Sequence, residues 1–163
     1  MKDKKALLDG LAQAVVILNE FVATIPADKL DVRRGEGFWT INEHVSHLAD
    51  VQPMLLERLQ RFEIEASPAF VPFTPDNDET ADSGPPNVPT SEALKQFADF
   101  RRQQLDLLKA ADDRTWQKTA THPEYAQYAF YILVRHILMH DHWHMYRMEE
   151  LWLTNDEFLT ELQ

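Results

Sequence analysis

The sequence predicts an all-α protein, a four-helix bundle with a long crossover loop between its second and third helices. Four segments place apolar residues three and four positions apart, the spacing of amphipathic helices. A proline-rich stretch, about 63–89, separates the second segment from the third. The other two connections are shorter, and four long helices connected in this way form a bundle.

The first two helices have clear boundary signals. The first is predicted from Lys4 to Thr24, and Pro26 ends it. The second begins at Thr40, because Thr40-Ile-Asn-Glu43 is a capping box in which each side chain satisfies a backbone amide of the other residue. It runs to about Phe62. Pro53 lies inside it, and since the apolar spacing continues past this proline, we expect a kink there.

The stretch 63–89 holds six of the nine prolines, several acidic residues and no lysine or arginine. This composition predicts an extended acidic loop, either a solvated crossover connection or a lid over a pocket. A third helix is predicted from Thr90 or Ser91 to about Ala110. A link over 112–124 follows, with Trp116 as a packing anchor, and the fourth helix is predicted from about Tyr125 to Leu153.

Length and composition limit the classes of function. A chain of 163 residues is expected to form one domain over 1–163. The formal net charge of −11, with no basic patch, argues against a nucleic-acid partner. No signal peptide and no run of about 20 apolar residues is evident, so we expect a cytoplasmic protein with no membrane partner. Because the chain has no cysteine, any metal must be held by nitrogen and oxygen.

Histidines carry the main chemical signal. Four of the seven lie between residues 136 and 144. On a helix, His136, His140 and His144 share the apolar face, whereas His142 points away. Imidazoles four residues apart can chelate one ion, which makes both His140/His144 and His136/His140 candidate pairs. The alternative is a set of core histidines hydrogen-bonded to polar neighbours.

A third ligand must come from another helix, and the second helix offers Glu43, His44, His47 and Asp50. The apolar arc of that helix is centred nearest His44, while His47 lies at its edge. Periodicity places His44 deeper and does not choose between the two histidines.

Three segments resemble the DinB-like superfamily, the bacterial group that includes damage-inducible protein B and YfiT-like proteins. They are Trp39-Thr-Ile-Asn-Glu-His-Val-Ser-His-Leu-Ala-Asp50, His122-Pro-Glu-Tyr125 and His136-Ile-Leu-Met-His-Asp-His-Trp-His144. The resemblance implies a divalent metal on His47, His140 and His144. It makes His44 a packed neighbour, and it makes His136 a core or supporting residue rather than a ligand. This chain departs from the family where Met145-Tyr146-Arg147 replaces a frequent Gly-Gln or Ala-Gln pair.

Three protein ligands leave a coordination position open, as catalytic sites require. Zinc, nickel, iron or manganese would suit the ligands. The resemblance implies a metal-dependent thiol transferase that uses a low-molecular-weight thiol, and a hydrolase acting on a small electrophilic substrate is the related expectation. The competing class is a non-catalytic sensor, binding or structural bundle. A di-iron carboxylate bundle is excluded because no Glu-x-x-His occurs.

Three further residues are candidates for catalytic roles. Asp50 and Asp141 are placed to orient an imidazole or take a proton, and the alternative for each is a solvated helix acid. Arg147 is a candidate to hold an anionic substrate group, and its alternative is an ion pair with Asp50 or Glu150. A homodimer through bundle faces is also expected, with Trp143 or Trp152 at the contact.

Overall fold

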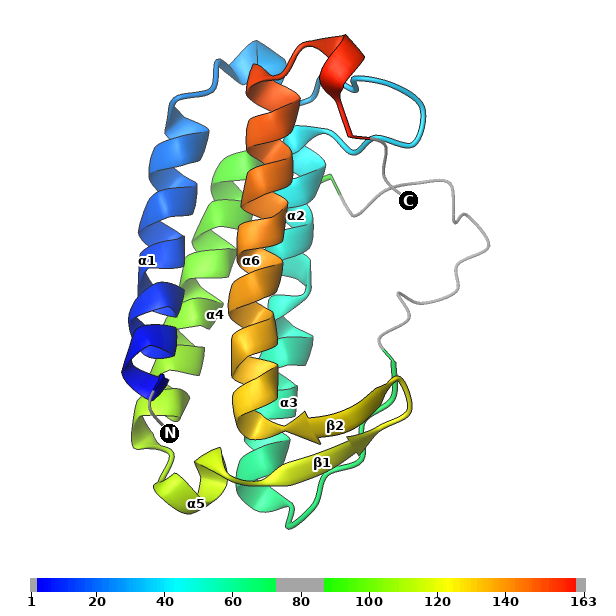
Figure 1. Ribbon diagram of the computed structural model, residues 1–163. Coiled ribbons are helices and arrows are strands. Elements are labelled where there is room, and N and C mark those ends of the chain that lie inside the picture. Colours follow the sequence, from blue (N-terminus) through cyan, green and yellow to red (C-terminus); the bar gives the residue numbers. More distant parts are fainter. Residues whose placement is uncertain (1–2, 73–86, 161–163) are drawn as a thin grey trace.

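The computed structural model describes residues 3–72 and 87–160, and it confirms the four-helix bundle (Figure 1). Around the bundle the order is α1, α4, the pair α2 and α3, then α6, which returns to contact α1. The bundle helices are α1 (Lys4–Ala23), α2 (Ile41–Asp50), α3 (Gln52–Ile64), α4 (Thr90–Ala110) and α6 (Phe130–Leu153). The short elements are η1 (Ala27–Lys29), α5 (Asp113–Trp116), β1 (Thr119–His122), β2 (Tyr125–Ala129) and η2 (Asp156–Phe158).

The second and third predicted helices run in the same direction, which explains the long connection. The Thr90 hydroxyl donates to the Asn42 side chain at 2.6 Å, so the N-terminal ends of α2 and α4 lie together. A chain leaving the far end of α3 must therefore travel back along the bundle before α4 begins. Residues 73–86 of this connection lie outside the described residues. The two predictions for this stretch, a solvated connection and a lid over a pocket, fall on these residues.

The first helix buries one face, as its spacing predicts, in contact with α4 and α6. Among the described residues, α1 is also the one helix long and apolar enough to cross a membrane, judged by length and composition. Its buried side chains are Leu7, Leu11, Ala14, Leu18 and Val22.

The second predicted helix is interrupted rather than kinked within one continuous helix. α2 ends at Asp50 and α3 begins at Gln52, with Pro53 in its first turn. Proline has no N–H to donate to the carbonyl four residues earlier, which is that of Ala49. The Gln96 side chain donates to this carbonyl instead, at 3.4 Å. The interruption therefore has a local cause and a partner for the freed carbonyl group.

The region before the last helix differs from the prediction of a loop and an early helix start. β1 and β2 form an antiparallel hairpin in which Thr119 faces Ala129, and the last helix begins only at Phe130. The β-branched residues of Thr119-Ala-Thr121 and the turn at Pro123-Glu124 are hairpin signals that the helical reading missed. Trp116, just before the hairpin, is 2% exposed and is the anchor that was predicted.

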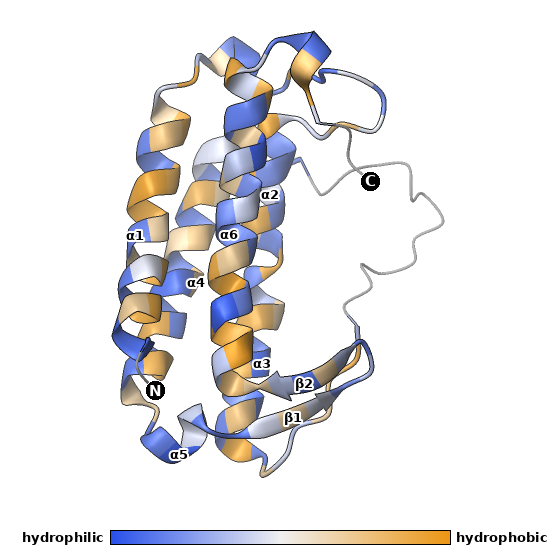
Figure 2. Cartoon of the chain, in the orientation of Figure 1, coloured by the Kyte–Doolittle hydropathy of each residue, from blue (hydrophilic) through white to orange (hydrophobic). Residues whose placement is uncertain are grey.

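The buried apolar side chains form two clusters, one toward each end of the bundle. Three helices of the bundle carry buried polar residues near mid-length: Gln52 on α3, Arg101 and Gln104 on α4, and Asp141 on α6. Arg101 donates to Asp141 at 2.7 Å and to Gln104 at 2.9 Å, and Gln104 donates to Gln52 at 2.9 Å. A buried polar layer therefore crosses the middle of the bundle. In Figure 2, α6 changes at this level from a mainly apolar first half to a mainly polar second half.

Candidate metal centre

The candidate site lies between α2 and the second half of α6. The predicted capping box is present: the Glu43 amide donates to the Thr40 hydroxyl at 3.1 Å, and the Thr40 amide donates to the Glu43 carboxylate at 2.6 Å. It fixes the start of α2 one turn before His44 and His47. α6 presents His140 and His144 four residues apart on the face toward α2.

Three imidazole nitrogens converge at one point. Nε2 of His140 lies 3.2 Å from Nε2 of His47 and 3.2 Å from Nε2 of His144. Within the described residues, one nitrogen from each of these three histidines lies within 4.8 Å of the other two. A tetrahedral ion with metal–nitrogen distances of about 2.0–2.1 Å has nitrogen–nitrogen separations of roughly 3.3 Å. The three side chains therefore fit a divalent metal ion.

Hydrogen bonds alone do not satisfy this arrangement. Nε2 of His140 has either one proton or one lone pair, so it makes one good hydrogen bond and not two. Its other ring nitrogen, Nδ1, is buried and has no hydrogen-bond partner among the described residues. A cation at the point of convergence would accept all three lone pairs, and for this reason the chemistry of the donor set favours a metal over hydrogen-bonded core histidines.

Burial keeps these imidazoles uncharged at neutral pH, as metal ligands must be. It lowers the pKa of His140 to about 4, with smaller contributions from His47 and Arg101. Burial, with the neighbouring imidazoles, also lowers the pKa of His144. It lowers the pKa of His47 as well, although the carboxylate of Asp50 opposes that change.

His44 lies directly behind the cluster. Its Nδ1 is 2.8 Å from Nδ1 of His144, while Nε2 of His144 faces His140. Burial, followed by the charge of Arg147, lowers the pKa of His44 to about 3. The deeper position that periodicity gave His44 is thus observed, at 1% exposure, and its ring contacts one of the three convergent histidines from the outside.

The candidate catalytic residues lie in different surroundings. Asp50 is exposed at the end of α2, near enough to His47 for its charge to act on that imidazole. Asp141 is fully buried and pairs with Arg101 in the polar layer, so it is neither a solvated acid nor a partner of the convergent histidines. Arg147 is buried, pairs with Glu150 and donates to the Thr160 carbonyl at 3.0 Å, which corresponds to the ion-pair alternative.

The two remaining histidines of α6 lie apart from the convergent group, and the helical wheel predicts this for His142 but not for His136. His142 is exposed. His136 is half-buried and lies outside the convergent group, with its ring 5.3 Å from that of Tyr125.

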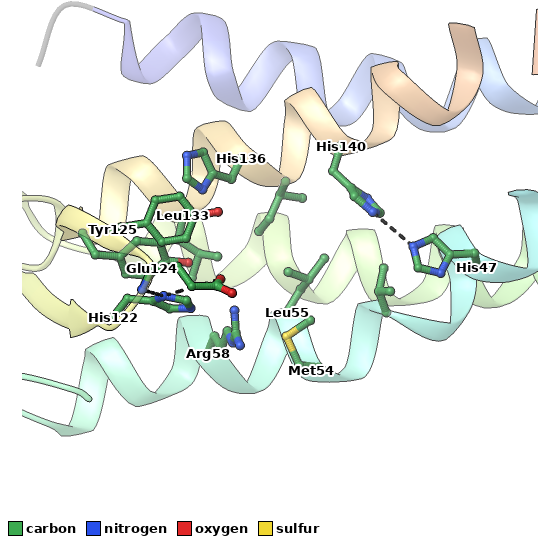
Figure 3. A pocket seen from close by; sticks show the side chains of 13 residues that line it. His47, Met54, Leu55, Arg58, His122, Glu124, Tyr125, Leu133, His136 and His140 are labelled. Atoms are coloured by element: carbon green, nitrogen blue, oxygen red, sulfur yellow. Dashed lines mark hydrogen bonds and ion pairs between the residues drawn. The ribbon is translucent and has the colours of Figure 1, made fainter. Parts of the chain in front are cut away.

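Two features of the surroundings were not anticipated. The Trp39 ring lies 5.1 Å from the His47 ring and 5.9 Å from the His144 ring, and covers the cluster on the side where α2 begins. A cavity of about 280 Å³ adjoins His47 and His140 and extends toward the hairpin (Figure 3). The His122-Pro-Glu-Tyr125 segment was the one sequence signal for this cavity, because its walls come from two stretches far apart in the chain, 47–58 and 122–140.

The sequence profile of the DinB superfamily matches residues 11–148, which span all four bundle helices and the convergent histidines. The chain belongs to the DinB superfamily. A search of the curated proteins finds no match. Among solved structures, this DinB-superfamily chain is similar to YfiT from Bacillus subtilis, with a TM-score of 0.75 and 22% sequence identity. The match covers 93% of this chain and 86% of YfiT, which is described as a probable metal-dependent hydrolase with an unusual four-helix bundle topology. The likeness shows the shared fold.

Proposed function

We propose that this DinB-superfamily protein is a metal-dependent hydrolase acting on a small molecule. The observation that carries the proposal is the convergence of three uncharged imidazole nitrogens beside a cavity. Three protein ligands leave a coordination position for water or substrate, which a closed structural site with four protein ligands would not do. The description of YfiT as a probable metal-dependent hydrolase gives the reaction class.

His47, His140 and His144 would hold the ion, and zinc, nickel, iron and manganese are the candidates. A divalent ion on three neutral imidazoles supplies a bound water of lowered pKa and polarises a substrate carbonyl or similar group. Trp39 shields the cluster from solvent on one side. We assign Asp50 the role of proton acceptor, since its charge already acts on His47 and it is exposed to solvent.

The first experiment is elemental analysis of protein purified without a histidine tag. We expect about one equivalent of a divalent metal, lost in both His47→Ala and His140→Ala. His142→Ala is the matched control, because it removes an exposed histidine from the same helix and should leave the metal in place. A parent protein that takes up no metal, even after loading, would leave a packed histidine cluster and would refute the proposal.

Activity decides between the chemical alternatives. The metal-loaded protein and its two histidine variants are to be assayed with esters, amides and lactones, and then with low-molecular-weight thiols and electrophiles. Hydrolysis that is lost with the metal supports the proposal. Thiol transfer alone would make the protein a transferase, and bound metal without turnover in either assay would make it a sensor, binding or structural bundle.

We also propose that the protein forms a homodimer. Met139 and Tyr146 are apolar or aromatic side chains on one exposed face of α6, with exposed fractions of 59% and 63%, and Trp143 lies between them at 48%. Such a row favours a protein contact. Analytical ultracentrifugation at micromolar concentration should show a dimer that Tyr146→Arg dissociates. A monomeric parent protein would contradict this proposal.

A further inference from the structure

The cavity beside the convergent histidines has two chemically different ends. His47 and His140 line one end, and the other end lies near the hairpin, where Arg58 and His122 face the same space (Figure 3). Met54 and Leu55 lie between the two ends (Figure 3), and Leu133 and Ile137 are further apolar side chains of the lining. A ligand that fills this cavity therefore needs an apolar body and a polar group at the end distant from the histidines.

Arg58 is the cationic group at the distal end. Its guanidinium donates to the Val71 carbonyl at 2.8 Å and lies over the Phe70 ring, 5.5 Å from the ring centre. Among the described residues, no carboxylate forms an ion pair with Arg58, and the same holds for Arg114 and Arg135. The other six arginines have such a partner: Arg33, Arg34, Arg61, Arg101, Arg102 and Arg147. A guanidinium has five N–H donors in a planar fork that matches a carboxylate. Arg58 thus retains donors for an anion in the cavity.

The polar groups near Arg58 are the Tyr128 phenol, the His122 ring and the Glu124 carboxylate. Burial raises the pKa of Tyr128, against the opposing charge of Arg58, so its phenol keeps its proton. The Glu124 amide donates to Nδ1 of His122 at 3.3 Å, and the Glu124 carboxylate lies 4.0 Å from the same nitrogen. The carboxylate of Glu124 lines the same end, and it disfavours a doubly charged phosphate more than a singly charged carboxylate.

The dimensions limit the ligand. The volume of about 280 Å³ lies at the lower end of the range of small-molecule pockets, roughly 300–1,000 Å³, so the cavity favours a small ligand. His47 and Arg58 are eleven residues apart on the nearly continuous α2 and α3, a rise of about 16 Å, part of which the long arginine side chain spans. These dimensions favour a ligand with a short chain between its two polar ends.

We propose that the cavity binds a small amphipathic carboxylic acid, with its carboxylate on Arg58 and its apolar chain over Leu55 and Ile137. Its other end then lies at His47 and His140, where the reaction takes place. The last statement rests on the proposed function, whereas the carboxylate site does not depend on a metal.

The test is a binding titration with hexanoate, which has eight non-hydrogen atoms, beside hexanol as the uncharged match. It uses metal-free protein, because a carboxylate would also coordinate a metal ion at the histidine end. Binding is followed by the shifts of backbone amide signals in two-dimensional NMR. We expect hexanoate to shift signals of α3 and the hairpin and to bind at least about tenfold more tightly than hexanol.

Variants locate the site. Arg58→Gln should weaken hexanoate binding about tenfold or more and leave hexanol binding unchanged. Arg61→Gln is the matched control, since Arg61 lies on the same helix but is already paired with Glu65. Arg58→Lys keeps the positive charge and the packing over Phe70 but loses the planar fork of N–H donors, so it should retain part of the affinity for hexanoate. It replaces Arg58→Gln in the test if that variant does not fold.

Each outcome decides the proposal. Equal hexanoate affinities for the parent protein, Arg58→Gln and Arg58→Lys, or signal shifts confined to another surface, would overturn it. Binding that depends on Arg58 in a protein without hydrolase activity would support the carboxylate site while refuting the proposed function. If the protein is a metal-dependent hydrolase but shows no Arg58-dependent preference for carboxylates, the proposed function is supported and the carboxylate site is refuted.

Discussion

At the scale of single residues, the two ring nitrogens of His144 have different partners. Nε2 faces His140, and Nδ1 is 2.8 Å from Nδ1 of His44. A metal on Nε2 leaves the proton of His144 on Nδ1, so His44 must accept it through its own Nδ1. If His144 holds the proposed ion through Nε2, His44 would be a positioning residue that sets the orientation and tautomer of that ligand.

We expect His44→Ala to weaken metal binding about tenfold to a hundredfold without changing the stoichiometry at saturating metal, because the ligand loses its hydrogen-bond acceptor. Competition with a chromophoric chelator measures the affinity. His44→Asn, whose amide oxygen is also an acceptor, should recover part of it. Identical affinities for His44→Ala and the parent protein would show that His44 only fills space.

At the scale of secondary-structure elements, local bonds hold the site residues in place. α2 contributes His44 and His47 within two turns of its start, and the capping box at Thr40 fixes that start. The Arg101–Asp141 pair joins α4 to α6 just beside His140.

Thr40→Val should lower the free energy of unfolding by about 1 kcal/mol, the usual value for a lost helix N-cap. Because fraying of α2 would move His47, metal affinity should fall as well. Urea unfolding and the chelator competition measure the two effects. Thr115→Val is a suitable control, since its hydroxyl is not part of a capping box at the site, and it should leave metal affinity unchanged.

Asp141→Leu should lower the free energy of unfolding by about 3–5 kcal/mol, because it leaves the charge of Arg101 buried and unpaired. The double variant Arg101→Met with Asp141→Leu should regain most of that loss. Chemical unfolding of the single and double variants measures both. A double variant no more stable than the single one would mean that shape, rather than the unpaired charge, causes the loss.

At the scale of the whole molecule, the bundle keeps several histidines uncharged. The pKa values of His44 and His140 are about 3 and about 4 in the folded protein, against an ordinary value near 6.5. Between these limits the unfolded chain binds more protons than the folded protein. The histidine contribution to stability is thus complete above about pH 6.5 and is lost as pH falls toward 4.

We expect the free energy of unfolding of the metal-free protein to fall between pH 6.5 and 4, by at most about 1.4 kcal/mol per pH unit for each fully buried histidine. Urea unfolding at several pH values gives the slope. His44→Asn removes one such group, so its slope should be shallower by up to that amount. Parallel curves for the two proteins would show that His44 does not take part.

Helical periodicity predicted the bundle, because it identifies the buried face of each helix, and the proline-rich composition of 63–89 predicted the crossover. The convergent set His47, His140 and His144 was implied by the family resemblance, since periodicity did not choose between His44 and His47. Periodicity did not predict which faces meet. The wheel placed His44 and His47 on the same side of α2, and only the packing of α6 separates a convergent histidine from the one behind it. Asp141 was misread because its partner, Arg101, lies on a helix 40 residues away in sequence. The hairpin was missed because Tyr125 to Ala129 has residues that also fit a first helical turn.

His47 and His140 are 93 residues apart in sequence, yet their Nε2 atoms are 3.2 Å apart. An ion held between them would act as a reversible cross-link that closes a loop of this length, and it would stabilise only the folded chain. Chelation should therefore loosen the molecule unevenly. The seam between α2 and the second half of α6 would gain hydrogen exchange first, while the α1–α4 face, which shares no ligand, would keep its protection.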